Sequence, residues 1–163
     1  MSQTVEMVSL PITADRSRSL PGEGAGTVVV SGLSSDSHTW NLIFLQLLIE
    51  EAGFDVVNLG PTVPDDLLLS EILSHDPVLV VISSVNGHGY QDGLRVIKKL
   101  RGDCFLARTP MVIGGKLGIA GAKDDERVAE LVGAGFDAVF DDSRSELESF
   151  EQFLRTRAQL ARR

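Results

Sequence analysis

Asp36 and His38 stand two residues apart in a polar segment that directly follows a run of β-branched residues. At this spacing the carboxylate can accept a hydrogen bond from one ring nitrogen of the histidine while the other nitrogen points outward. Such a bond fixes the tautomer of the imidazole and makes it a better ligand for a metal ion or a better partner for a proton. A loop aspartate is also a common helix N-cap, so the pair alone leaves both interpretations open.

The residues around this pair predict the end of a buried strand and the start of a helix. Val28, Val29 and Val30 are typical of a strand that is covered on both faces, and the apolar-rich run 42–49 is long enough for a helix. Segment 34–39 is therefore predicted to be a strand-to-helix loop, over which we expect Trp40 to pack. In an open α/β sheet, ligands bind at loops of this kind.

The alternation of strand and helix continues along the chain. After a first strand that begins at Thr27, strands are predicted near 54–59, 78–84, 110–115 and 137–140, and helices near 41–52, 64–75, 90–102, 124–134 and 145–160. Five strands that alternate with five helices predict an α/β fold with a doubly wound parallel sheet of flavodoxin-like order 2-1-3-4-5. Residues 1–25 lack this periodicity and predict a flexible arm, which leaves 26–163 as the domain.

The predicted topology brings three loops to one edge of the sheet, namely 34–39, 83–89 and 114–121. Each loop is rich in serine or glycine, which lets a bulky ligand approach the backbone and offers hydroxyl and N–H groups for hydrogen bonds. His88 in the second loop is a further candidate for contact with a ligand.

The composition limits the classes of molecule that the protein is expected to bind. The chain has 163 residues and a formal net charge of −8, which suits one globular domain and disfavours nucleic acid and anionic membranes as partners. Neither a membrane-spanning apolar run nor a signal peptide is present, so we expect a cytoplasmic protein. Cys104 is the single cysteine, which excludes an internal disulfide and a multi-cysteine metal site.

The sequence lacks the motifs that several other functions require. The glycines after residue 113 do not have the spacing of a phosphate loop, and no serine or threonine follows Lys116. A phospho-acceptor receiver domain would need an aspartate where Ser83 and Ser84 stand. No Gly-x-Ser-x-Gly elbow of a serine hydrolase is present.

A resemblance to a known family rests on three motifs, which occur along the chain in the order Asp36-Ser37-His38, Ser83-Ser84-Val85 and Gly114-Gly115-Lys116. With them on these three loops, the chain resembles the cobalamin (B12)-binding domain family, and within it the small subunits of glutamate (methylaspartate) mutase. The resemblance covers about residues 27–154.

The resemblance implies adenosylcobalamin as the cofactor, with His38 as the lower axial ligand of cobalt in place of the dimethylbenzimidazole base. Asp36 would hydrogen-bond to His38, and the displaced nucleotide tail would lie along Ser35, Ser83, Val85 and Gly114-Gly115. The implied cofactor-binding residues are Ser35, Asp36, Ser37, His38, Thr39, Ser83, Ser84, Val85, Gly114, Gly115 and Lys116.

It further implies a subunit of an isomerase that converts glutamate to 3-methylaspartate and is active only with a large barrel-type subunit, which this chain is too short to supply. The radical chemistry would belong to the cofactor. The alternative is a cobalamin carrier or sensor module for methyl transfer or regulation.

Asn41 departs from the family pattern, which has glycine at this position. A side chain beside the tail costs about 1–3 kcal/mol if it overpacks the site, more than the few tenths that asparagine gains over glycine in helix propensity. We therefore expect Asn41→Gly to tighten cobalamin binding and slightly lower the stability of the free protein. Weaker binding by the variant would instead mean that Asn41 hydrogen-bonds to the tail.

Overall fold

Five parallel strands form one sheet in the order β2-β1-β3-β4-β5, in a computed structural model that describes residues 24–118 and 124–163. The strands are β1 Thr27–Gly32, β2 Asp55–Asn58, β3 Leu79–Ser84, β4 Met111–Gly115 and β5 Ala138–Asp141. The predicted fold class and strand order are thus confirmed. Residues 1–23 of the predicted arm lie outside the described residues, and Ala25 at its end is buried against the core.

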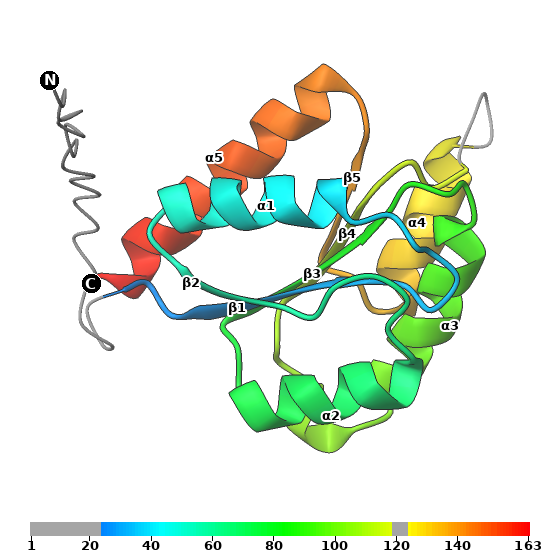
Figure 1. Ribbon diagram of the computed structural model, residues 1–163, viewed down its shortest axis with the longest axis horizontal. Coiled ribbons are helices and arrows are strands. Elements are labelled where there is room, and N and C mark those ends of the chain that lie inside the picture. The colour runs from blue at the N-terminus through cyan, green and yellow to red at the C-terminus, as the bar shows by residue number, and fades with distance from the viewer. Residues whose placement is uncertain (1–23, 119–123) are drawn as a thin grey trace, which may run out of the picture.

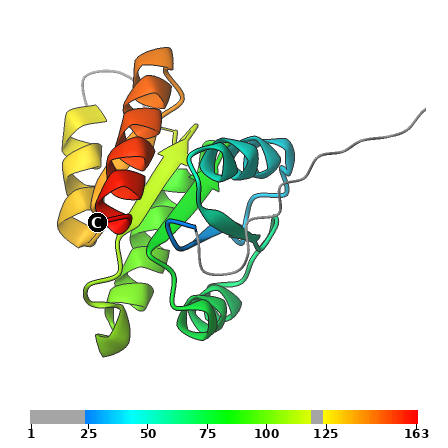
Figure 2. The same cartoon turned by 90° about the vertical axis from the view of Figure 1, so that its left-hand side faces the viewer.

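Five α-helices connect the strands: α1 Trp40–Glu51, α2 Asp65–His75, α3 Gly89–Arg101, α4 Asp124–Ala134 and α5 Arg144–Ala161. Each lies within one residue of its predicted bounds. Helices α1 and α5 cover one face of the sheet, and α2, α3 and α4 cover the other (Figures 1 and 2). A short 3-10 turn, η1 (Cys104–Leu106), precedes β4 and was not predicted.

The alternation of side chains along the strands builds one apolar layer on each face. On strand β1, between β2 and β3, Val28 and Val30 pack toward α1 and α5, whereas Val29 packs toward α2 and α3. All three valines have no exposed surface. Burying such a side chain stabilises the fold by about 1.5–3 kcal/mol, so the two layers fix the sheet from which the loops extend.

Helix α1 is apolar on its outer side as well as its inner side. Leu42 and Ile49 are buried against the sheet, but four apolar residues at helical spacing are more than 40% exposed: Trp40, Ile43, Phe44 and Leu47. The expectation that Trp40 packs over the preceding loop is wrong, because this side chain in the first turn of α1 is 64% exposed.

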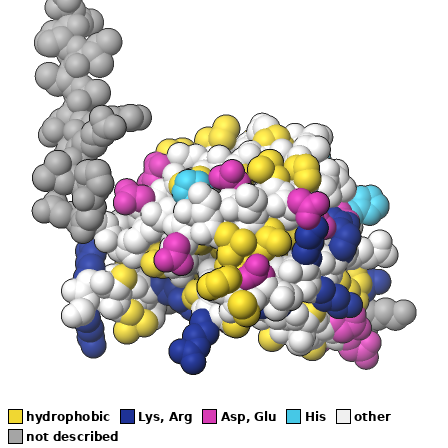
Figure 3. All heavy atoms as spheres, turned by 90° about the horizontal axis from the view of Figure 1, so that it is seen from below, with side chains coloured by type: hydrophobic (Ala, Val, Ile, Leu, Met, Phe, Trp, Pro, Cys, Tyr) yellow, Lys and Arg dark blue, Asp and Glu magenta, His cyan; other side chains and the backbone are white. Residues whose placement is uncertain are grey.

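Ion pairs join α2 to α3 on the opposite face. Arg95 bonds to Asp65 at 2.9 Å and Lys99 pairs with Asp66. Figure 3 shows acidic and basic side chains beside one another on this side of the molecule, among apolar ones. Because these groups are largely exposed, each pair contributes at most about 1 kcal/mol. No helix in residues 24–118 or 124–163 is long and apolar enough to cross a membrane.

Candidate cofactor-binding site

Asp36 and His38 lie at the carboxyl edge of the sheet, in the loop between β1 and α1. The Oδ1 atom of Asp36 is 2.7 Å from Nδ1 of His38 and also accepts the backbone N–H of His38 at 3.0 Å. The carboxylate is 2% exposed, whereas the imidazole is 49% exposed. Nδ1 therefore donates to Asp36, and Nε2 is left free to bind a metal ion with its lone pair.

The second oxygen of Asp36 is also bonded. Its Oδ2 accepts the backbone N–H of Val85 at 2.7 Å and the hydroxyl of Ser84 at 3.1 Å. Burial by itself raises the pKa of Asp36, but the bond from Val85, the bonds from His38 and the bond from Ser84 outweigh it, so the pKa lies below its usual value. The carboxylate is ionised at neutral pH and holds His38 in one tautomer.

Asn86 connects the loop after β3 to the loop after β1 through hydrogen bonds. Its Nδ2 donates to the carbonyl of Ser35 at 3.0 Å, and its Oδ1 accepts the backbone N–H of His88 and shares the one hydroxyl hydrogen of Ser84 with Asp36. The hydroxyl of Ser35 in turn donates to Asp92 in the first turn of α3. Burial raises the pKa of Asp92, yet the bonds from Ser35 and Arg95 prevail and lower it.

A cavity of about 350 Å³ lies between the first turns of α1 and α5, above the ends of β3 and β4. Of the predicted cofactor-binding residues, Ser83, Val85, Gly114 and Gly115 line it. Its walls are largely apolar and aromatic, with Phe44, Leu45, Phe140, Leu147 and Phe150 among them. Charged residues of the β5–α5 connection, including Asp141, Asp142 and Arg144, stand along it as well. The shape and lining suit a flat, partly polar group.

The other predicted residues have different surroundings. Ser37, His38, Thr39 and Lys116 are exposed, and the Lys116 carbonyl accepts the N–H of Gly87. Ser35 and Ser84 do not line the cavity and belong to the hydrogen-bond network around Asp36. The structure thus brings Asp36, His38, Ser84 and Val85 together and places the cavity-lining residues beside them.

Gly114 and Gly115 bring the end of β4 close to its neighbours. A Cβ atom on Gly114 would stand 2.6 Å from the carbonyl oxygen of Phe140, and one on Gly115 would overlap the carbonyl oxygen of Ser84. Gly115 also has a φ of +99°, which side chains with a Cβ rarely adopt. Only glycine therefore allows this strand end to pass under the cavity.

Asn41 is buried in the first turn of α1 and lines the cavity. Its Nδ2 donates to Oγ of Ser83 at 2.8 Å. Its Oδ1 is the one buried side-chain oxygen or nitrogen in the described part of the chain that has no hydrogen-bond partner. The side chain thus has a hydrogen bond at Nδ2 and none at Oδ1.

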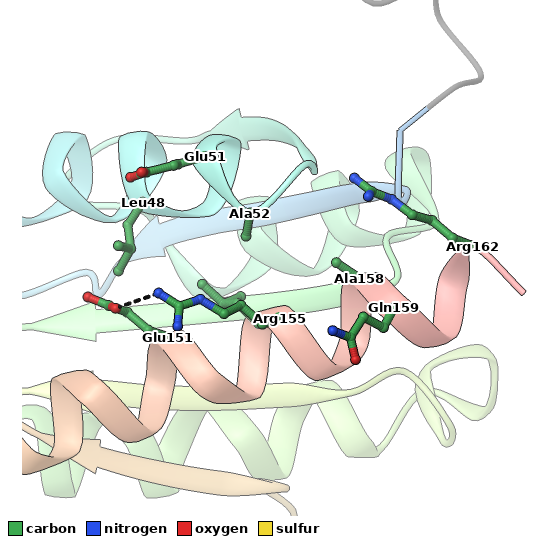
Figure 4. Close-up of a pocket in the computed structure, with 9 residues that line it drawn as sticks. Leu48, Glu51, Ala52, Glu151, Arg155, Ala158, Gln159 and Arg162 are labelled. Atoms are coloured by element: carbon green, nitrogen blue, oxygen red, sulfur yellow. Dashed lines mark hydrogen bonds and ion pairs between the residues drawn. The ribbon is translucent and has the colours of Figure 1, made fainter.

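A second, larger cavity of about 540 Å³ lies between the carboxyl-terminal halves of α1 and α5 (Figure 4). Charged side chains surround it, including Glu51, Arg162 and the Glu151–Arg155 pair at 3.2 Å. It is at the opposite end of α1 from His38, so its greater volume does not make it part of this site.

Two features of the site were not found from the sequence. Asn86 was predicted only as part of the loop 83–89, with no role of its own. The aromatic wall formed by Phe44, Phe140 and Phe150 was interpreted as ordinary helix and strand core. Its signal was weak, since the residues come from three separate elements.

Comparisons with known proteins identify the family of this chain. A family model described as "B12 binding domain" matches residues 26–152. Glutamate mutase sigma subunit 1 of Haloarcula marismortui is 33% identical over 77% of this chain and 82% of its own length. The sigma subunit of Halobacterium salinarum is 35% identical over 70% of this chain and 75% of its own.

Solved structures share the fold at low identity. A cobalamin-binding protein from Desulfitobacterium hafniense has a TM-score of 0.61 at 17% identity, and the match covers 78% of this chain but 58% of that protein. The response regulator CheY4 of Vibrio cholerae has a TM-score of 0.58 at 14% identity over 78% of this chain and 98% of its own. From the family match and the sigma-subunit relatives, the chain belongs to the B12-binding domain family and is similar to the small subunits of glutamate mutase.

Proposed function

We propose that this chain is the adenosylcobalamin-binding small subunit of a carbon-skeleton mutase, with glutamate and 3-methylaspartate as its substrate pair and His38 as the lower axial ligand of cobalt. The observation that carries the proposal is the 2.7 Å bond between Nδ1 of His38 and the ionised, buried Asp36, which leaves Nε2 free at the exposed edge of the sheet. A carboxylate that fixes the tautomer and orientation of an imidazole also makes it a stronger ligand for a metal ion such as cobalt.

The residues present fit the rest of the cofactor. The cavity between α1 and α5 can receive the nucleotide tail, with Ser83, Val85 and the two glycines along it, and Val85 also bonds to the Asp36 that holds His38. When bound, adenosylcobalamin supplies radical chemistry by homolysis of its cobalt–carbon bond. The chain itself holds the imidazole in one tautomer through Asp36 and surrounds the tail with apolar walls that exclude water.

The substrate and the partner follow from the relatives. Proteins that match most of this chain are named glutamate mutase sigma subunits, which supports a glutamate mutase with a larger partner subunit. We propose that this partner is of barrel type and holds the amino acid. A carrier for methyl transfer would use the same His38 and differ in the upper ligand and the partner. Mutase activity that appears only on mixing with a large subunit separates the two functions, and turnover by the isolated chain would contradict the two-component proposal.

The axial-ligand assignment is tested by the absorption spectrum of the bound corrinoid and by nitrogen hyperfine coupling from labelled histidine. Wild-type protein is expected to bind cobalamin with the base displaced and one histidine nitrogen on cobalt. His38→Ala should lose that coupling and shift the spectrum, while His75→Ala, on the far helix α2, should leave both unchanged. An unchanged spectrum in His38→Ala would mean that another group occupies the lower position.

A further inference from the structure

We infer that Arg95 is a positioning residue for the cobalt ligand: from helix α3 it holds the turn that leads into Asp36 and His38. The inference rests on the proposed function, since it assumes that His38 binds cobalt. It adds to that function a residue that lies outside the expected cofactor contacts and yet controls how the imidazole is presented.

A tight turn of residues 33–36, the serine turn, separates β1 from the loop that carries the imidazole. The backbone N–H of Asp36 donates to the carbonyl of Leu33 at 3.0 Å, which places Ser34 and Ser35 at the two central positions. The chain runs from this turn directly into the histidine loop. A shift of the serine turn therefore changes the position of the proposed ligand.

Arg95 bonds to the serine turn and to two carboxylates through different nitrogens. Nη2 donates to Oγ of Ser34 at 3.0 Å, Nε donates to Asp65 of α2 at 2.9 Å, and Nη1 donates to Asp92 of its own helix. Asp92 in turn accepts the hydroxyl of Ser35. One guanidinium thus joins α2 and α3 to both central residues of the turn.

This set of bonds requires the planar fork of arginine. The side chains of Asp65 and Asp92 are only 17% and 13% exposed, so each carboxylate depends on a nearby cation to offset its loss of water. Their bonds, first that of Asp65 and then that of Asp92, raise the pKa of Arg95 above its usual value, and the guanidinium stays charged. A lysine has a single nitrogen and cannot serve both carboxylates and the turn in this geometry.

Lys99 provides a comparison within the same pair of helices. It lies four residues after Arg95 on α3 and pairs with Asp66 on α2, so it makes an ion pair of the same kind. Among the described residues, Asp66 is its one bonded partner. Loss of either cation weakens the contact between α2 and α3, but only loss of Arg95 also releases the serine turn.

The test measures cobalamin binding by the full chain and by variants that separate these two effects. Spectral titration gives the dissociation constant, nitrogen hyperfine coupling from labelled histidine gives the fraction of cobalt that carries histidine, and urea denaturation gives the stability. The variants are Arg95→Met, Arg95→Lys, Lys99→Met, Ser34→Ala and the double variant Arg95→Met/Ser34→Ala.

We expect Arg95→Met to weaken cobalamin binding about tenfold and to lower the histidine-bound fraction, at the lower end of the range for groups that orient a metal-binding histidine. Lys99→Met loses an exposed ion pair, so its dissociation constant should change by less than about twofold. Ser34→Ala should weaken binding about threefold in the wild-type background, the loss of one hydrogen bond, and should have no further effect in Arg95→Met.

Equal dissociation constants for Arg95→Met and Lys99→Met would overturn the inference, as would effects of Arg95→Met and Ser34→Ala that multiply in the double variant. Arg95→Lys is expected to recover stability but not affinity, and full recovery of affinity would contradict the role of the fork. Ser34→Ala keeps every ion pair, so it tests the bond to the turn even if Arg95→Met folds poorly. A wild-type complex without histidine on cobalt would overturn the proposed function and this inference together, whereas the outcomes above overturn the inference alone.

Discussion

The carboxylate of Asp36 accepts the backbone N–H of Val85 at 2.7 Å, which joins the loop after β1 to the end of β3. Because the same carboxylate also holds His38, one buried group sets both the position of the loop and the orientation of the imidazole.

Asp36→Asn is expected to lower cobalamin affinity by about 10–100-fold, the usual loss when the partner of a metal-binding histidine is removed. The amide replaces one acceptor oxygen with a donor, so an N–H of Val85 or His38 is left unpaired. We expect the free energy of unfolding to fall by about 1–3 kcal/mol. Spectral titration and urea denaturation measure the two effects, and unaltered values in both would contradict the role of Asp36 in holding His38 and the loop.

Asn86→Ala is expected to loosen the contact between the loops after β1 and β3. The variant removes the amide bond to the Ser35 carbonyl and the acceptor that serves Ser84 and the backbone of His88. Since the site is partly exposed, we expect a loss of about 1 kcal/mol in stability and faster amide hydrogen exchange in these loops. Exchange rates that match those of the wild type would show that Asp36 alone holds the loops together.

Asp92→Asn is expected to lower stability at neutral pH but not in acid. The pKa of Asp92 is lowered in the folded protein, so its ionised form stabilises the fold above the unfolded pKa, and that contribution is lost as the pH falls through the folded value. The difference in unfolding free energy between wild type and variant should therefore shrink as the pH drops below about 4. Because Asp92 is near the surface, we expect a difference of at most about 1 kcal/mol at pH 7. A constant difference from pH 7 to pH 3 would contradict the ionic origin.

Gly115→Ala is expected to destabilise the protein by at least about 2 kcal/mol, because the new Cβ overlaps the Ser84 carbonyl and the residue has a positive φ. Gly133→Ala in α4 is the matched control. An added Cβ there has no atom within 4 Å, so alanine should raise stability by about 0.5–1 kcal/mol through helix propensity. Thermal melts of both variants distinguish a crowded strand end from a general intolerance of alanine, and equal effects would contradict the steric argument.

The sequence predicted the fold well because each element has a strong local signal. Val28–Val30 and the apolar run around Val81 are typical of buried parallel strands, and Gly53 and Pro77 interrupt the chain at helix and strand boundaries. The strand order followed from these elements and from the handedness of their connections.

The site was predicted less completely, since its contacts join residues that are far apart in the chain. The Asp36–His38 bond was expected from a spacing of two, but the bonds of Asp36 to Ser84 and Val85 have no pattern in the sequence. Ser35 was assigned to the tail from the resemblance alone, and the bond from its hydroxyl to Asp92 on α3 has no pattern in the sequence. The exposure of Trp40 depends on how helix α1 is rotated about its own axis, and the composition of the helix does not determine that rotation.

The pairing of β1 with both β2 and β3 has a consequence for the order in which the protein folds. The bond from Val85 to Asp36 spans 49 residues, so the loop that carries His38 acquires its final shape only after β3 has paired beside β1. Closing a contact over that length is slower than forming the helices between them. A nascent chain that has emerged only through α2 already contains the Asp36–His38 motif but lacks half of the groups that position it. A cofactor that bound at His38, as proposed, would therefore stabilise chains whose strands β1 and β3 have already paired, and it would leave earlier intermediates unaffected.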